Sequence, residues 1–153
     1  MNKIEFKKLV LQAAKQRQQE IIEDFKRRIK ELNSNEDTVE EDMLDRDKQA
    51  MDASNDHLIN GLADQVNFVI EEMNLLNRIQ IGDSAHEQVA VGSIVRTDKQ
   101  TFFPSVSIEK FEVNKQDLFG ISAKSPIYKV MKGKKTGDVF EYNKSEYKIL
   151  EVY

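Results

Sequence analysis

The chain has 153 residues, of which 33% are charged and 39% hydrophobic; this balance excludes wholesale disorder and allows one or two small domains. The absence of cysteine excludes disulfides and thiolate zinc sites, and the two histidines, His57 and His86, lie too far apart in sequence to form a structural metal site by themselves. No apolar stretch approaches the ~20 residues of a membrane span, and the first apolar run, residues 9–11, is too short for a signal peptide, so we expect a cytoplasmic protein with no membrane contact.

Charge and composition both divide the chain. Residues 1–33 have a net charge of +4, residues 34–83 of −10 and residues 84–153 of +2, which together give the overall −4. Such segregation shapes the electrostatic potential that a partner meets. Residues 1–81 contain no proline and a single glycine, whereas both prolines and the other glycines come later. We therefore predict two domains, residues 1–81 and 82–153.

The first domain is predicted to form two helices, over residues 3–33 and 39–79. In each helix, apolar residues recur mainly three or four positions apart, which is the spacing of a coiled-coil seam. The first seam comprises Ile4, Leu11, Ala14, Gln18, Ile22, Phe25, Ile29 and Leu32. The second comprises Leu58, Leu62, Gln65, Val69, Met73 and Leu76, with Leu44 and Met51 as its extension towards the N-terminus.

A polar segment separates the two seams. Asn33, Ser34 and Asn35 favour a turn, and Thr38 with Glu41 fits a capping box that starts the second helix. Two narrow apolar stripes are most easily buried against each other, so we predict an antiparallel coiled-coil hairpin and a monomeric protein. The alternative is a homo-oligomeric coiled coil of two longer helices, which the turn residues disfavour.

The second domain is predicted to be a small α+β domain with a mostly antiparallel sheet. Strands are expected over residues 89–97, 101–111, 139–142 and 147–153, where β-branched and aromatic residues gather. Five aromatic residues are expected in the core of this domain rather than in a ligand pocket: Phe102, Phe103, Phe111, Phe119 and Tyr128.

A short helix is expected before the third of these strands. Ser125 is its predicted cap, Pro126 begins its first turn, and Gly133 ends it. Gly137 and Asp138 then turn the chain into the next strand. The buried face of this helix is expected to comprise Ile127, Val130 and Met131.

The segment around this helix, residues 121–139, has the sequence ISAKSPIYKVMKGKKTGDV. It resembles the C-terminal signature of the Gre transcript cleavage factors, whose pattern is IS..SPI...L.GK..GD.V. The last residues, YKILEVY, are similar to the family's final strand, and Gly92 with Ser93 stands where the family has the glycine that opens its first strand. The resemblance covers about 60 residues and extends to the order of the parts. It implies a helical hairpin followed by an FKBP-like domain with a short helix.

The resemblance also implies a function. In the Gre family the hairpin enters the secondary channel of bacterial RNA polymerase, and its acidic tip helps to hold a catalytic Mg²⁺ with which the polymerase cleaves backtracked RNA. The protein would then be a transcription elongation factor that completes the polymerase active site and is no enzyme by itself. Its partners would be the polymerase and, only within that complex, the 3′ end of the nascent RNA. Mg²⁺ would be shared with the polymerase, because this ion prefers hard oxygen ligands and extra carboxylates strengthen a weak site.

The acidic segment near residues 34–46 would be the tip. Asp37 and Glu40 reproduce the D..E spacing of the family's tip, GDL.ENAEY, and are the expected metal-binding pair. The asparagine and tyrosine that follow in the family are absent here. A purely structural interpretation is that these carboxylates favour a helix start and stay solvated. Three further carboxylates are expected to support or replace the pair in the catalytic role: Glu41, Asp42 and Asp45.

Two other clusters have both a functional and a structural interpretation. The resemblance implies that Ser125, Pro126 and Ile127 contact the rim of the polymerase channel as well as starting a helix. It also implies that a basic patch on the first helix contacts the RNA 3′ end through its phosphates, although nearby acidic residues are equally consistent with a balanced, solvated face. The basic residues are Lys26, Arg27, Arg28 and Lys30. We expect no exposed aromatic on either helix, and therefore no independent nucleic-acid binding.

Three functions stay open on the sequence. The first is a cleavage factor, and the second is a Gre-like channel binder that does not cleave but inhibits or modulates transcription. The third is a coiled-coil adaptor whose hairpin binds another partner.

Overall fold

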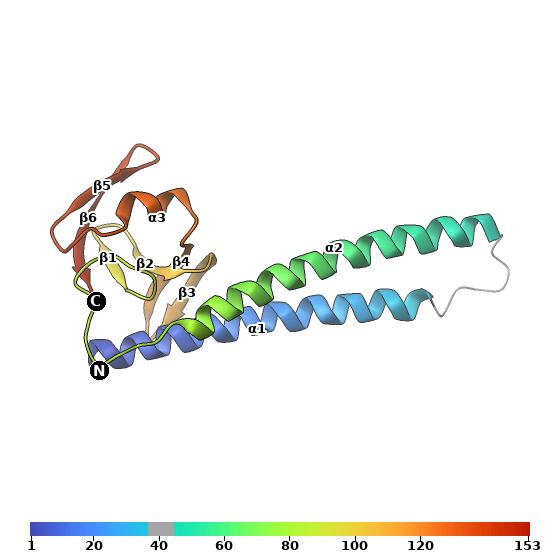
Figure 1. Cartoon of the computed structure of the whole chain (residues 1–153), viewed down its shortest axis with the longest axis horizontal. Coiled ribbons are helices and arrows are strands. Elements are labelled where there is room, and N and C mark those ends of the chain that lie inside the picture. The colour runs from blue at the N-terminus through green and yellow to red at the C-terminus, as the bar shows by residue number, and fades with distance from the viewer. Residues whose placement is uncertain (37–44) are drawn as a thin grey trace. The chain divides into compact units, whose positions relative to one another are not determined.

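The structure is a computed structural model that describes residues 1–36 and 45–153, and the side chains of residues 1–33 and 53–153. Two long helices come first, α1 (Lys3–Glu36) and α2 (Asp45–Arg78). Six strands and a short helix follow (Figure 1): β1 (Val95–Thr97), β2 (Thr101–Ser105), β3 (Ile108–Val113), β4 (Gln116–Ser122), α3 (Pro126–Met131), β5 (Val139–Tyr142) and β6 (Ser145–Val152). None of the described helices is long and apolar enough to span a membrane.

The chain divides into two compact units. The first, the helical unit, consists of residues 17–73, and the second, the sheet unit, consists of residues 1–16 with 74–153. The N-terminal part of α1 and the last residues of α2 therefore belong to the sheet unit. The long helices nevertheless end at Arg78, close to the predicted shift in composition. That residues 1–81 and 82–153 behave as separate domains stays a prediction.

In the helical unit, α1 and α2 lie side by side and antiparallel (Figure 1). The amide Nε2 of Gln18 donates a hydrogen bond of 3.1 Å to the Glu72 carboxylate, and Ile22, Val66 and Val69 are buried. The apolar stripe of each helix is thus covered by the other helix of the same chain. The predicted hairpin is confirmed, and burying this seam requires no second chain.

The seam of α2 differs from the predicted one at two positions. Leu58 is 51% exposed and Gln65 is also exposed, whereas Ile59 is half-buried and Val66 is buried. Leu58 and Gln65 are wrong because the buried residues keep a regular spacing of three and four positions, and this spacing passes through the next residues, Ile59 and Val66. The corrected seam comprises Ile59, Leu62, Val66, Val69, Met73 and Leu76.

The limits of α1 depend on different residues from those expected. At its start, Asn2 Oδ1 accepts a 2.8 Å hydrogen bond from the Glu5 N–H, and Glu5 accepts one from the Asn2 N–H, which is a reciprocal cap. At its end, α1 continues to Glu36 through the residues predicted to break it, 33–35. Serine and asparagine are only modestly unfavourable inside a helix. The predicted cap at Thr38, like Leu44, lies outside the described residues, and the side chain of Met51 does too.

The sheet has the order β3-β4-β2-β1-β6-β5. Four of its pairings are antiparallel, but β2 and β4 are parallel, with Phe102 opposite Phe119. The predicted mostly antiparallel sheet is confirmed, and the pairing of β2 with β4 makes it a mixed sheet. The parallel pair arises because β4 inserts between β2 and β3, so that two strands adjacent in sequence are separated in the sheet.

The predicted strand over residues 101–111 is two strands, β2 and β3, and the prediction missed β4 altogether. Asn114 and Lys115 join β3 to β4 with φ angles of 53° and 65°, the left-handed conformation of a tight hairpin turn. The predicted strand over residues 89–97 is shortened to β1, because Gly92, with φ 90°, turns the chain and donates a hydrogen bond of 2.8 Å to the Pro104 carbonyl.

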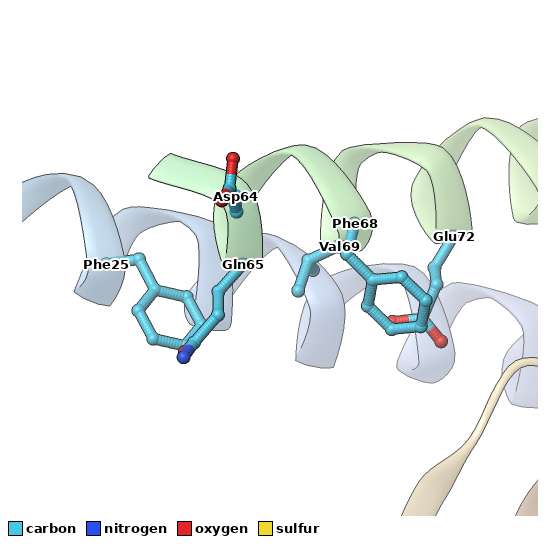
Figure 2. Close-up of a pocket in the computed structure, with 6 residues that line it drawn as sticks. All are labelled: Phe25, Asp64, Gln65, Phe68, Val69 and Glu72. Atoms are coloured by element: carbon cyan, nitrogen blue, oxygen red, sulfur yellow. The ribbon is translucent and has the colours of Figure 1, made fainter. Parts of the chain in front are cut away.

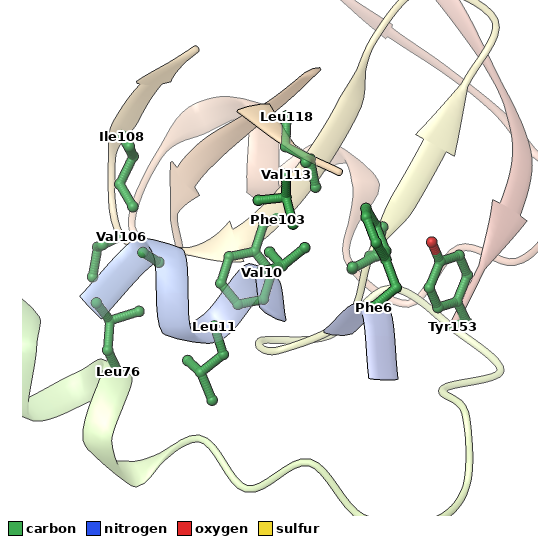
Figure 3. Packing of buried hydrophobic residues seen from close by; sticks show 12 residues of the cluster. Phe6, Val10, Leu11, Leu76, Phe103, Val106, Ile108, Val113, Leu118 and Tyr153 are labelled. Atoms are coloured by element: carbon green, nitrogen blue, oxygen red, sulfur yellow. The ribbon is translucent and has the colours of Figure 1, made fainter. Parts of the chain in front are cut away.

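Each face of the sheet carries a core, and neighbouring residues of β2 point to opposite faces. Phe103 belongs to the first core, in which residues of α1 and Leu76 of α2 pack on the sheet (Figure 3). Phe102 belongs to the second core, with Tyr128 and Met131 of α3. The predicted core aromatics are confirmed: Phe102, Phe103 and Tyr128 are buried, and Phe111 and Phe119 are half-buried against the same cores.

Candidate functional site

Most of the predicted acidic tip lies outside the residues that the structure describes. Asp37, Glu40, Glu41 and Asp42 lie outside the described residues, and Asp45 is the first residue of α2, with its side chain outside them. Within the described part of the chain, no group of three or more His, Asp or Glu side chains could hold a metal ion. The role of the tip carboxylates as a metal-binding pair therefore stays a prediction.

The predicted basic cluster lies on α1 in the helical unit. Arg27 and Arg28 both form ion pairs with Asp24, the second through Nη2 and Oδ2 at 3.0 Å. The Arg28 guanidinium also lies 5.7 Å from the centre of the Phe25 ring. Lys26 and Lys30 are exposed on the same helix. Two of the four cations thus share one carboxylate, and the contact of the cluster with RNA stays a prediction.

Ser125 starts α3 as predicted. Its hydroxyl donates a 2.6 Å hydrogen bond to the Ser122 carbonyl and accepts one from the Tyr128 N–H at 3.4 Å, with Pro126 at the first helical position. Pro126 is exposed and Ile127 packs against the second core. The structural role of this segment is confirmed, and its contact with the polymerase stays a prediction.

The buried face of α3 differs from the predicted face at one position. Tyr128 and Met131 are buried, whereas Val130 is 39% exposed. The prediction for Val130 is wrong because Val130 follows Tyr128 by two positions, which places it on the opposite side of the helix from the buried tyrosine ring. Tyr128 takes the place expected of Val130.

The other residues of the 121–139 segment position its turns. Gly133 has φ 79° and donates a 2.9 Å hydrogen bond to the Val89 carbonyl. Gly137 has φ 91°, and its N–H donates to the Ile149 carbonyl at 2.8 Å. The Asp138 carboxylate accepts from the Lys135 N–H at 2.8 Å. The glycines and the aspartate of this segment thus form the turns that connect α3 to β5.

Comparison with known proteins yields matches among solved structures. No protein-family model matches the chain, and no curated protein matches it. Among solved structures, it matches the crystal structure of GreA factor homolog 1 (Gfh1) protein of Thermus thermophilus. The matched protein is a homologue of a Gre factor. The match has 17% sequence identity and a TM-score of 0.34, and it covers 94% of this chain and 92% of that chain. A match at this level of similarity assigns no role to this chain or to any of its residues.

The sequence reasoning missed a buried lysine in the sheet unit. Lys7 of α1 is 1% exposed, and its Nζ lies 2.8 Å from Nδ1 of His86, to which the amine donates. Burial lowers the pKa of Lys7, and burial together with the adjacent Lys7 charge lowers the pKa of His86. The sequence held a signal for the burial of Lys7, because Lys7 fills the seam position between Ile4 and Leu11 that the predicted seam left empty, but it held none for the contact with His86.

The lowered pKa of His86 predicts acid sensitivity of the sheet unit. Because the folded state binds this proton less readily than the unfolded chain, we expect the free energy of unfolding to fall as the pH falls through about 6.5. His86→Gln removes this titration and should flatten the dependence between about pH 7.5 and 5.5. Urea unfolding followed by tyrosine fluorescence measures it. His57→Gln, which replaces an exposed histidine of α2, is the control; equal pH dependence of His86→Gln and wild type would contradict the assignment.

The sequence reasoning also missed an aromatic groove in the helical unit (Figure 2). Phe68 is 63% exposed beside this groove, so the expectation that neither helix exposes an aromatic side chain is wrong. The corrected seam is the reason, because burial of Val66 and Val69 turns Phe68 outward. The groove is lined by Phe25, Asp64, Gln65, Phe68, Val69 and Glu72.

Proposed function

We propose that the chain is an accessory factor of bacterial RNA polymerase that binds through the secondary channel and stimulates cleavage of backtracked RNA. The observation that carries the proposal is the segment of residues 121–139, which resembles the Gre signature at several fixed spacings. Its position, between β4 and β5 and after a helical hairpin, agrees with the order of parts in that family. The factor would act in the cytoplasm, where the polymerase is.

The chemistry of the proposed function belongs to the tip. Asp37 and Glu40 would be brought into the polymerase active site by the hairpin, with Glu41, Asp42 and Asp45 beside them. Carboxylate oxygens are the donor type that Mg²⁺ prefers, so this set of side chains suits the ion. When bound, Mg²⁺ activates a water and stabilises charge on the reacting phosphate. The contribution of the chain is to add negative charge and oxygen ligands to a site that holds its second metal weakly.

The hairpin suits the task of carrying such a tip. In the helical unit, the seam between α1 and α2 is closed by apolar residues and by the bond between Gln18 and Glu72. A pair of packed helices holds its backbone hydrogen bonds internally and needs little width. It can therefore enter a narrow pore without exposing unpaired backbone groups.

A specific observation favours a second candidate. The asparagine and tyrosine of the family's tip are missing after Glu40, which suits a factor that occupies the channel without supporting cleavage. Such a factor would inhibit or otherwise modulate transcription. An adaptor unrelated to the polymerase is the third candidate, and it would share only the hairpin.

A cleavage assay on backtracked complexes separates the candidates. Purified polymerase, halted on a template and backtracked, is incubated with Mg²⁺ with and without the chain, and RNA shortening is followed over time. The proposal expects faster cleavage with the chain present. Binding without faster cleavage, together with competition against a Gre factor, would favour the second candidate. Absence of binding to the polymerase would leave the adaptor.

A further inference from the structure

The aromatic groove of the helical unit is open to solvent along the two-helix surface. It has a volume of about 370 Å³ and combines Phe25 of α1 with Phe68 and Val69 of α2. In Figure 2 the rings of Phe25 and Phe68 and the carboxylate of Glu72 lie on the same side of α2. A single exposed apolar side chain is common on protein surfaces and needs no explanation. Here two aromatic rings, with Val69 between them, form a larger apolar surface, which is typical of an interaction site.

The Phe68 ring makes little contribution to the fold of the helical unit. With 63% of its surface exposed, its burial against the chain is small, whereas Val66 and Val69 on either side of it close the seam. Aromatic residues at such positions are typical anchors of protein–protein contacts, because they bury a large surface at low cost in side-chain entropy.

The charge around the groove selects the kind of partner. Between residues 53 and 73, α2 carries four acidic residues and no lysine or arginine. Two of them, Asp64 and Glu72, line the groove, and Glu71 lies one helical turn beyond Phe68. On the α1 side, Arg28 lies over the Phe25 ring and pairs with Asp24, so it offsets part of this charge. The groove lining itself contains two carboxylates and no lysine or arginine. A lining of this charge disfavours nucleic-acid phosphates, so the exposed aromatic does not point to base stacking. It attracts a protein surface in which lysine or arginine flanks an apolar side chain.

We propose that this groove, the Phe68 groove, is a docking site for a basic and apolar segment in the wall of the polymerase channel. The inference rests on the proposed function, in which the hairpin lies within that channel. It adds that the shaft of the hairpin binds the wall by itself, through Phe68 as the apolar anchor and Asp64 as a flanking charge. Occupation of the groove by a second copy of the chain is the competing outcome.

The test measures the affinity of the full chain for purified bacterial RNA polymerase by biolayer interferometry. We expect Phe68→Ala to weaken binding by about tenfold, and Asp64→Lys to weaken it with a reduced dependence on salt. Leu58→Ala is the matched control, since Leu58 is an exposed apolar residue of the same helix that does not line the groove. It should change affinity by less than about twofold. Circular dichroism during heating verifies that the three variants stay folded.

Each outcome decides between the two proposals. If the wild type does not bind the polymerase, the proposed function fails and the docking site fails with it. If the wild type binds and Phe68→Ala binds equally well, or if Leu58→Ala loses as much affinity, the docking site alone is overturned. Sedimentation of the wild type as a dimer that Phe68→Ala converts to a monomer would also overturn it, because a second copy would then occupy the groove.

Discussion

Replacing Gly120 by alanine is expected to destabilise the sheet unit by about 3 kcal/mol or more. A Cβ at this position would lie 2.6 Å from the Val106 carbonyl oxygen, 2.8 Å from the Ile108 Cβ and 2.9 Å from the Ile108 nitrogen. Two of these three atoms are backbone, which cannot move without disturbing β3. Gly120 is paired with Phe103 of β2 on one side and with Ile108 of β3 on the other, so the strain would spread through the centre of the sheet.

Tyrosine fluorescence during urea unfolding measures this effect selectively. All four tyrosines lie in the sheet unit, and the chain has no tryptophan. The matched control is Gly61→Ala in α2, where nothing lies within 4 Å of the added methyl group. Alanine favours a helix over glycine by about 0.5–1 kcal/mol, so this variant should stabilise the helical unit. A Gly120→Ala protein that unfolds at the wild-type urea concentration would contradict the close packing at β4.

The second large effect concerns the proposed function. Replacing Asp37 and Glu40 together by alanine is expected to reduce stimulated RNA cleavage to the rate of the polymerase alone. The expected reason is the loss of the carboxylates that help to recruit Mg²⁺. Polymerase binding should be retained, because the signature segment and the hairpin shaft are unchanged. The measurement is the rate of RNA shortening in backtracked complexes, with binding measured in parallel.

A second double variant shows which carboxylates act. Asp42→Ala with Asp45→Ala removes the same amount of charge from the same segment, at the same spacing. If Asp37 and Glu40 are the pair, this control retains most of the stimulation. The opposite result would assign the role to Asp42 and Asp45. Equal losses in both variants would show that total negative charge matters and would contradict a defined pair.

Much of the fold follows from features that are local in the sequence. Heptad spacing and the polar segment near Asn33 predicted two packed helices, and Ser125, Pro126 and Gly133 predicted the position of α3. The capping of a helix and the left-handed turn at a glycine depend on a few neighbouring residues, so the sequence contains the information needed. The error at Leu58 and Gln65 was also local, since the regular spacing through Ile59 and Val66 was present in the sequence.

The candidate sites were predictable to a lesser degree. The acidic segment and the basic cluster were recognised from composition and from a family resemblance, neither of which determines which side chains meet. The pairing of Arg27 and Arg28 with Asp24 follows from helical spacing and was foreseeable. The exposure of Phe68 was not foreseen, because it depends on which face of α2 the seam occupies, and an error of one residue rotates that face by about 100°.

By itself, the sequence determined the helical hairpin, the cap of α3 and the resemblance that suggests a function. Only the tertiary structure decided the parallel pairing of β2 with β4, the close packing at Gly120 and the burial of Lys7 against His86. These three features join residues distant in sequence, 17 positions apart for Phe103 and Gly120 and 79 for Lys7 and His86. Local propensity does not predict such contacts, because their free energy arises from packing and desolvation that exist only once the chain has folded.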